Sequence, residues 1–250
     1  MRTFCLALCL FMLTAMAMAE EPEYFDWRGQ KLAGQGNYTG AIAYFDKALA
    51  QDPSNADVWI HKGDALAANK FYNESLVPYA KALNINRKKV AAWKGLANSY
   101  ASLGNYEYAS AALINATAID PKNVANLNDA GYYLQIVGKF NQSLVYFDKV
   151  LEIEPENQDA IVRKGRSLIA TGNVSEAAGL YDQLIVLDPK NKGAYNAKGL
   201  ALEAEGKLQE ARDNYYKALQ IDPKYGAAKG NLVHVLLYLK MYEEAMKYLV

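Results

Sequence analysis

Small and apolar residues recur along this chain at helical spacing, and residues 56–89 show the whole arrangement. An aromatic residue, a glycine and a leucine share one face of a helix expected over residues 57–68: Trp59, Gly63 and Leu66. The pattern is then interrupted, and small, large and small residues share one face of a second helix: Ser75, Tyr79 and Ala82. Because small residues let helices approach closely, this segment predicts a helical hairpin.

The hairpin pattern returns every 34 residues, so that a second helix is expected over residues 209–221 near the end of the chain. A glycine occupies the same position in five of the units: Gly36, Gly104, Gly138, Gly172 and Gly206. Lys70 and Lys240 occupy this position in the other two units. A proline closes most units, with Arg87 as a substitute: Pro53, Pro121, Pro155, Pro189 and Pro223. A fixed period without insertions indicates stacked repeats. The predicted units are residues 22–55, 56–89, 90–123, 124–157, 158–191, 192–225 and a partial unit, 226–250.

The pattern resembles that of the tetratricopeptide repeat (TPR) family from residue 22 to the end of the sequence. A small residue stands in the first helix of six units: Gly29, Gly63, Ala97, Gly131, Gly165 and Gly199. A small residue also marks each second helix: Ala41, Ser75, Ala109, Ser143, Ala177, Ala211 and Ala245. Large residues follow four positions later: Phe45, Tyr79, Leu113, Phe147, Tyr181 and Tyr215. The resemblance implies an all-α fold, a right-handed superhelical solenoid of six full repeats and one partial repeat.

Three places depart from the repeat pattern. Residues 87–89 replace the expected Asp-Pro, and we expect a solvated turn there, with the preceding helix extended by a residue or two. Pro78 removes one hydrogen bond inside a second helix, which therefore either starts late or kinks. In the last unit Lys229 and Val233 replace the aromatic residue and the glycine, so helix pairing is least well specified there.

Residues 1–19 differ from the repeats and predict a secretory signal peptide. Arg2 gives a positive start, an apolar run covers residues 4–13, and Ala17-Met18-Ala19 forms a small-residue cleavage site. The alternative is an uncleaved membrane anchor, although the apolar stretch is shorter than the ~20 residues that span a bilayer. We therefore expect a secreted or cell-envelope protein.

Composition argues against several classes of partner. The 27 basic and 27 acidic residues cancel, so no net charge attracts nucleic acid, and no nucleic-acid partner is expected. Both cysteines, Cys5 and Cys9, lie in the predicted signal peptide, so the mature chain has no disulfide and no thiol nucleophile. We expect no metal, no cofactor and no small-molecule substrate. A membrane partner is expected only if the N-terminal segment stays uncleaved.

Catalysis has little support in the sequence. The two histidines, His61 and His234, fall in the second and seventh units and should lie far apart, in the groove or on the surface of a solenoid. The chain contains no P-loop, GxSxG, HExxH or EF-hand motif. We therefore expect a protein that is not an enzyme.

Asn-x-Ser/Thr signals are more frequent than chance predicts. They occur at Asn37, Asn73, Asn141 and Asn173, and at Asn115, which falls within a helix and is the weakest candidate. Exposed turns of an exported chain suit N-linked glycans. A second interpretation is helix capping, because four polar residues share a position at the start of the second helix: Thr39, Asn73, Asn141 and Ser175. The two interpretations are compatible.

The TPR resemblance also implies a ligand site, because the first helices of TPR proteins line a concave groove. In the first two units the corresponding residues are acidic: Glu23, Asp26, Asp57 and Asp64. In the third to fifth units they form a candidate peptide-binding set: Lys94, Asn98, Asn128, Tyr132, Arg163 and Arg166. Part of this set matches the carboxylate clamp of some TPR adaptors, but Asp129 and Asp159 disfavour a purely anionic ligand. The ligand is expected to be a segment of mixed charge; alternatively, these residues pair with one another.

These features predict an exported protein–protein interaction module or scaffold that binds an extended segment of a protein or peptide partner in the concave groove. The alternative is a structural or self-assembling glycosylated component of the cell envelope with no specific peptide ligand. The last helical pattern reaches residue 250 without a polar outer face, so this edge is expected to be frayed, self-associating or covered by another chain.

Overall fold

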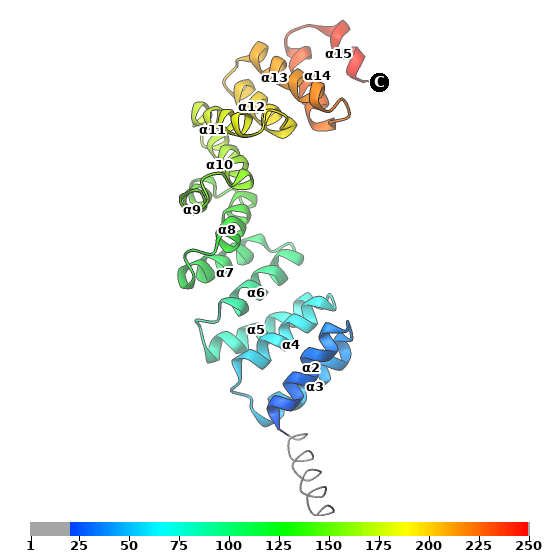
Figure 1. Ribbon diagram of the computed structural model, residues 1–250, viewed down its shortest axis with the longest axis vertical. Coiled ribbons are helices and arrows are strands. Elements are labelled where there is room, and N and C mark those ends of the chain that lie inside the picture. The colour runs from blue at the N-terminus through cyan, green and yellow to red at the C-terminus, as the bar shows by residue number, and fades with distance from the viewer. Residues whose placement is uncertain (1–20, 250) are drawn as a thin grey trace, which may run out of the picture. The chain divides into compact units, whose positions relative to one another are not determined.

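The computed structural model describes residues 21–249, which form fourteen helices and no strand (Figure 1). The first helix of each repeat, called the A helix here, has 13 residues: α2 (Pro22–Gly34), α4 (Ala56–Ala68), α6 (Val90–Ser102), α8 (Val124–Ile136), α10 (Gln158–Ala170), α12 (Lys192–Ala204) and α14 (Gly226–Tyr238). The second, or B, helices are α3 (Tyr38–Gln51), α5 (Tyr72–Ile85), α7 (Tyr106–Ile119), α9 (Phe140–Ile153), α11 (Val174–Leu187), α13 (Leu208–Ile221) and α15 (Tyr242–Leu249). The predicted signal peptide lies outside the described residues.

Each A helix begins at the first residue of a predicted repeat. The two helices expected over residues 57–68 and 209–221 begin one residue earlier, at Ala56 and Leu208. The prediction of an all-α solenoid built from tandem helical hairpins is therefore confirmed.

The helices form two compact units that divide between Asn126 and Leu127, inside α8. Within the units, consecutive helices contact each other from α2 to α7 and from α9 to α15. A helices also contact the A helix of the next repeat: α2 with α4, α4 with α6, α10 with α12, and α12 with α14. The A helices therefore line a continuous face within each unit.

The core of a repeat depends on a glycine of the A helix that lies against an aromatic ring of the B helix. A Cβ atom added to Gly63 would stand 2.7 Å from the Tyr79 ring, and one added to Gly199 would stand 2.4 Å from the Tyr215 ring. The third repeat has the buried pair Ala97 and Leu113 instead. An added methyl group on the A helix is thus accompanied by a smaller side chain on the B helix.

The turns and caps explain the remaining periodic residues. The turn after each A helix passes through the left-handed region, which suits glycine; Lys70 and Lys240 adopt it at φ values of 65° and 59°. The asparagine that ends a repeat caps the next A helix by accepting backbone N–H bonds, as Asn55, Asn157 and Asn191 do. These asparagine caps were not among the features predicted from the sequence.

The structure can be compared with what was expected at the three places where the sequence departs from the repeat pattern. Helix α5 ends at Ile85, at the same position as other B helices, so the expected extension by a residue or two is wrong. The turn at residues 87–89 is solvated as expected, apart from the half-buried Lys89. Helix α5 also begins at the usual position, Tyr72, with Pro78 buried inside it, so the late start is wrong as well. In the last unit α14 and α15 contact each other despite the substitutions there.

Candidate functional site

Lys94 and Asn98 lie on α6 in the first unit, one helical turn apart. Both side chains are exposed, while Ala92, Leu96 and Ser99 on the same helix are buried. Within residues 21–249 neither the Lys94 nor the Asn98 side chain has a hydrogen bond or an ion pair. Their charge and amide groups are therefore available to a ligand.

The second unit brings together most of the other predicted site residues. The guanidinium group of Arg163 on α10 lies 4.2 Å from the ring centroid of Tyr132 on α8. Its Nε atom is 2.7 Å from Oδ2 of Asp159, which also accepts a hydrogen bond from Nδ2 of Asn128 at 3.1 Å. Arg166 lies nearby on α10, exposed and without a hydrogen bond or ion pair among the described residues.

This cluster changes the charge expected on the A-helix face. Asp159 pairs with both Arg163 and Asn128, as the self-pairing alternative expects. Asp159 is neutralised by Arg163 and does not present an isolated negative charge. Lys94 and Arg166 remain as unpaired cations, the first in one unit and the second in the other.

A cavity of about 310 Å³ lies in the first two repeats, and Asp64 is the one residue of the predicted acidic set that lines it. Its lining includes Gln30, Phe45, His61 and Asp64. The Nδ1 atom of His61 is 2.8 Å from Oδ1 of Asp26, and this hydrogen bond raises the pKa of His61. Burial raises the pKa of Asp64, although the hydroxyl of Tyr79 donates a hydrogen bond to this carboxyl group at 2.7 Å.

Each histidine is therefore paired with a carboxylate of the preceding repeat, His61 with Asp26 and His234 with Glu203 at 2.7 Å. His61 was predicted to lie in the groove or on the surface, but its pairing with Asp26 could not be predicted from the sequence. Among the described residues, no group of three or more His, Cys, Asp or Glu side chains is arranged to hold a metal ion. No helix within residues 21–249 has the length and apolar character required to span a membrane.

All the sequon asparagines are exposed: Asn37, Asn73, Asn115, Asn141 and Asn173. The capping interpretation fails for the shared position of Thr39 and Asn73, because the N-cap of a B helix lies two residues earlier. Asn37 itself is such a cap, since its Oδ1 accepts a hydrogen bond from the Gly40 amide at 2.9 Å.

Two of the sequon serines have a structural role inside the solenoid. Ser75 and Ser143 are buried, and each forms a hydroxyl–hydroxyl bond of 2.7 Å with a serine of the next A helix, Ser99 and Ser167 respectively. Packing therefore accounts for the serine in these two sequons, and leaves the exposed asparagine unexplained.

Comparisons with known proteins give one consistent family. The sequence profile described as Tetratricopeptide repeat matches residues 28–89 and 162–226, more than half of the chain, and a second profile of the same description matches residues 90–123. No curated protein sequence matches the chain.

Solved structures match over most of the chain. YrrB, described as a TPR protein with an unusual peptide-binding site, is 22% identical with a TM-score of 0.65, over 74% of this chain and 95% of YrrB. A tetratricopeptide repeat protein from Parabacteroides merdae is 18% identical with a TM-score of 0.65, over 91% of this chain and 90% of that one. PilF from Pseudomonas aeruginosa is 17% identical with a TM-score of 0.57, over 80% and 90% respectively. At these identities the likeness establishes the fold.

Proposed function

The chain belongs to the tetratricopeptide repeat family, and from that premise we propose that it is an exported protein–protein interaction module or scaffold. It binds an extended segment of a partner along the A-helix face. TPR repeats are generally non-catalytic interaction modules, and YrrB is described as having a peptide-binding site. The predicted signal peptide supports an extracytoplasmic location.

The observation that carries this proposal is the set of unpaired polar groups on the A helices. Lys94 and Arg166 are exposed cations, and Asn98 is an exposed amide that can bond to a peptide backbone. Long side chains held without a partner suit ligand recognition better than stabilisation of the solenoid. Tyr132, fixed by the guanidinium group of Arg163, adds a partly exposed aromatic surface.

The chemistry of the face favours a segment of mixed charge. A carboxylate of the partner pairs with Lys94 in the first unit or with Arg166 in the second, where an apolar side chain packs on Tyr132. Exposed ion pairs contribute only ~0.2–1 kcal/mol each, so the aromatic contact and backbone hydrogen bonds are required as well. Affinity should fall as salt rises, because exposed charges are screened beyond about 8–10 Å at physiological ionic strength.

The test is a charge reversal at the two unpaired cations. The mature chain is used to isolate a partner from an envelope or extracellular fraction, and affinity for the partner is measured by calorimetry. Lys94→Glu with Arg166→Glu should weaken binding by about tenfold or more. The matched control, Lys122→Glu with Lys190→Glu, makes the same change in net charge in exposed turns and should leave affinity unchanged. Equal affinities for both double variants would overturn the proposal, provided that circular dichroism shows intact helices.

A second candidate function is a self-assembling glycosylated component of the cell envelope. It is favoured by the exposed apolar side chains on the last two helices, Leu237, Tyr238, Tyr242, Met246 and Leu249, and by the exposure of every sequon asparagine. Gel filtration separates the two functions. A binding module elutes as a monomer at all concentrations, whereas an assembling component shifts to larger species as concentration rises.

A further inference from the structure

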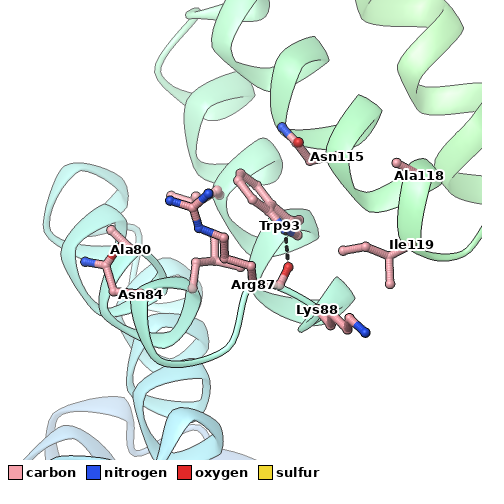
Figure 2. Close-up of a pocket in the computed structure, with 10 residues that line it drawn as sticks. Ala80, Asn84, Arg87, Lys88, Trp93, Asn115, Ala118 and Ile119 are labelled. Atoms are coloured by element: carbon pink, nitrogen blue, oxygen red, sulfur yellow. Dashed lines mark hydrogen bonds between the residues drawn. The ribbon is translucent and has the colours of Figure 1, made fainter.

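A cavity of about 550 Å³ opens in the first unit at the junction of the second and third repeats (Figure 2). It lies where α5 ends, among residues of α5, α6, α7 and the turn after α5, and so involves a different surface from the predicted groove residues. Apolar side chains form much of its lining, among them Ala80, Leu83 and Leu96, together with the ring of Trp93. Its size is typical of sites that accept a ligand or a large side chain.

This junction lacks an ion pair that some others contain, and its cavity is larger than the one of about 400 Å³ at the equivalent position between the fourth and fifth repeats, where the pair is present. At three other junctions an aspartate of the B helix pairs with a lysine of the next A helix: Asp46 with Lys62 at 2.5 Å, Asp148 with Lys164 at 2.8 Å, and Asp182 with Lys198 at 2.5 Å. The equivalent residues here are Ala80 and Leu96. Both partners of the pair are thus replaced by apolar residues at the same junction.

The preceding junction shows what the missing lysine covers. There the Nζ atom of Lys62 lies 5.7 Å from the ring centroid of Trp59, the residue equivalent to Trp93. Both indole groups are held in the same way, since Trp59 Nε1 donates to the Pro53 carbonyl and Trp93 Nε1 donates to the Arg87 carbonyl, each at 2.9 Å. The ring of Trp93 is therefore fixed, and the lysine that covers its counterpart is absent.

The turn beside the cavity has gained positive charge. Asn86 replaces the acidic residue that begins the turn in other repeats, yet its Oδ1 accepts the Lys88 amide at 2.9 Å as Asp188 accepts the Lys190 amide. The turn geometry is preserved while the negative charge is lost. Arg87 then replaces proline and is followed by Lys88.

Two cations of this turn, Arg87 and Lys88, have no ion-pair partner in the part of the chain that the structure describes. The third cation of the turn, Lys89, pairs with Asp57 at 2.6 Å. Arg87 and Lys88 are exposed, and no carboxylate within residues 21–249 forms an ion pair with either. An apolar cavity with a ring held at its wall is thus bordered by two unpaired cations.

We propose that this cavity is a second protein-docking site, which binds an acidic partner segment with one large apolar side chain. The apolar side chain enters the cavity against Trp93 and Leu96. Carboxylates on either side of it in the partner pair with Arg87 and Lys88. Charge complementarity selects this occupant, because a basic segment would be repelled by the same two cations.

The test introduces the ion pair that three other junctions contain. Ala80→Asp with Leu96→Lys should place a lysine beside Trp93, as Lys62 lies beside Trp59, and should narrow the cavity without unfolding the repeats. The probe is a short fluorescein-labelled peptide with Leu-Phe between glutamates, and its partner control has lysines in place of the glutamates. Every chain tested carries Asn115→Gln, because Asn115 lines the cavity and belongs to a sequon.

The glutamate peptide should bind the parent chain, and the double variant should weaken this binding by about tenfold or more, measured by fluorescence anisotropy. Arg87→Glu with Lys88→Glu, both in an exposed turn, should reverse the preference toward the lysine peptide. Lys122→Glu with Lys190→Glu is the charge-matched control and should bind as the parent does. The proposal is overturned if the parent binds neither peptide, if it binds both equally, or if neither double variant changes affinity for the glutamate peptide.

Discussion

Single side chains in this protein are constrained by contacts that repeat from hairpin to hairpin. The A-helix glycine faces an aromatic ring so closely that no added Cβ atom fits without movement, whereas other glycines stand in open space. The same residue type is thus required at one position and replaceable at another. The two cases can be distinguished by experiment.

Gly199→Ala should destabilise the protein by ~1–3 kcal/mol, because the new Cβ atom would stand 2.4 Å from the buried Tyr215 ring. Gly179→Ala, inside α11 with no atom within 4 Å of an added Cβ, should instead stabilise it by ~0.4–1 kcal/mol through its better helix propensity. Chemical denaturation measures both changes. The same sign for both variants would contradict the assigned packing.

The Asp26–His61 pair should make stability depend on pH. The hydrogen bond to Asp26 raises the pKa of His61, burial of the ring opposes this effect, and Asp64 and Asp57 add smaller favourable charges. A raised pKa means that the folded state favours the protonated ring. The stabilisation is complete below the unfolded pKa of ~6.5 and is lost as the pH rises through the folded pKa.

The free energy of unfolding of the parent should therefore exceed that of Asp26→Asn most at acidic pH, and the difference should shrink across the range above ~6.5. Urea denaturation at a series of pH values measures this difference. A difference that stays constant with pH would show that the pair does not favour the charged imidazole.

Between neighbouring helices, the small residue of each B helix sets how closely the helices approach. Ala211 on α13 is completely buried, and Ala41, Ala109 and Ala177 are equally inaccessible at the same position. Ser75 and Ser143 occupy this position in two repeats, where each meets a serine of the next A helix. A buried serine is thus tolerated at this crossing position where a serine of the next A helix forms a hydrogen bond with its hydroxyl group.

Ala211→Leu should cost ~1–3 kcal/mol of stability, because three added carbon atoms must displace a neighbouring helix or adopt an unfavourable rotamer. Gln209→Leu, exposed on the same helix, adds a similar apolar group and should change stability by no more than about 0.5 kcal/mol. Thermal denaturation compares the two variants. Similar melting temperatures would mean that the crossing position has been assigned to the wrong residue.

For the molecule as a whole, stability depends on stacking, because each hairpin buries its apolar face against its neighbours. The described helices provide this within two compact units. The predicted signal peptide precedes the first described helix, which begins at Pro22. Removal of residues 1–19 would therefore leave every described helix complete.

Export predicts a mature chain that begins at or near Glu20. N-terminal sequencing of protein recovered from the culture medium or the envelope should give this start, since the Ala-Met-Ala site directly precedes it. Ala19→Arg should block cleavage and retain the longer form. Recovery of the parent from membranes with Met1 intact would favour the anchor instead.

The period, the helix positions and the small–large packing positions could all be predicted from the sequence. Each follows from interactions within one hairpin or between neighbouring hairpins, which a fixed 34-residue spacing reports directly. The resemblance to the TPR family was also based on this regular 34-residue spacing. Helix capping was misassigned by two residues, because a polar residue near a helix start is a cap only if its backbone leaves the helix there.

Which charged side chains form ion pairs could not be predicted from the repeat spacing. Arg163 and Lys94 were equivalent candidates in the sequence, but Arg163 reaches Asp159 and Tyr132 whereas Lys94 has no ion-pair partner among the described residues. The cavity beside Trp93 likewise brings together Ala80 and Leu96, which lie on different helices and have no distinctive feature in the sequence. Long side chains choose partners by distance and rotamer across adjacent helices, so their pairing emerges only once the repeats are stacked.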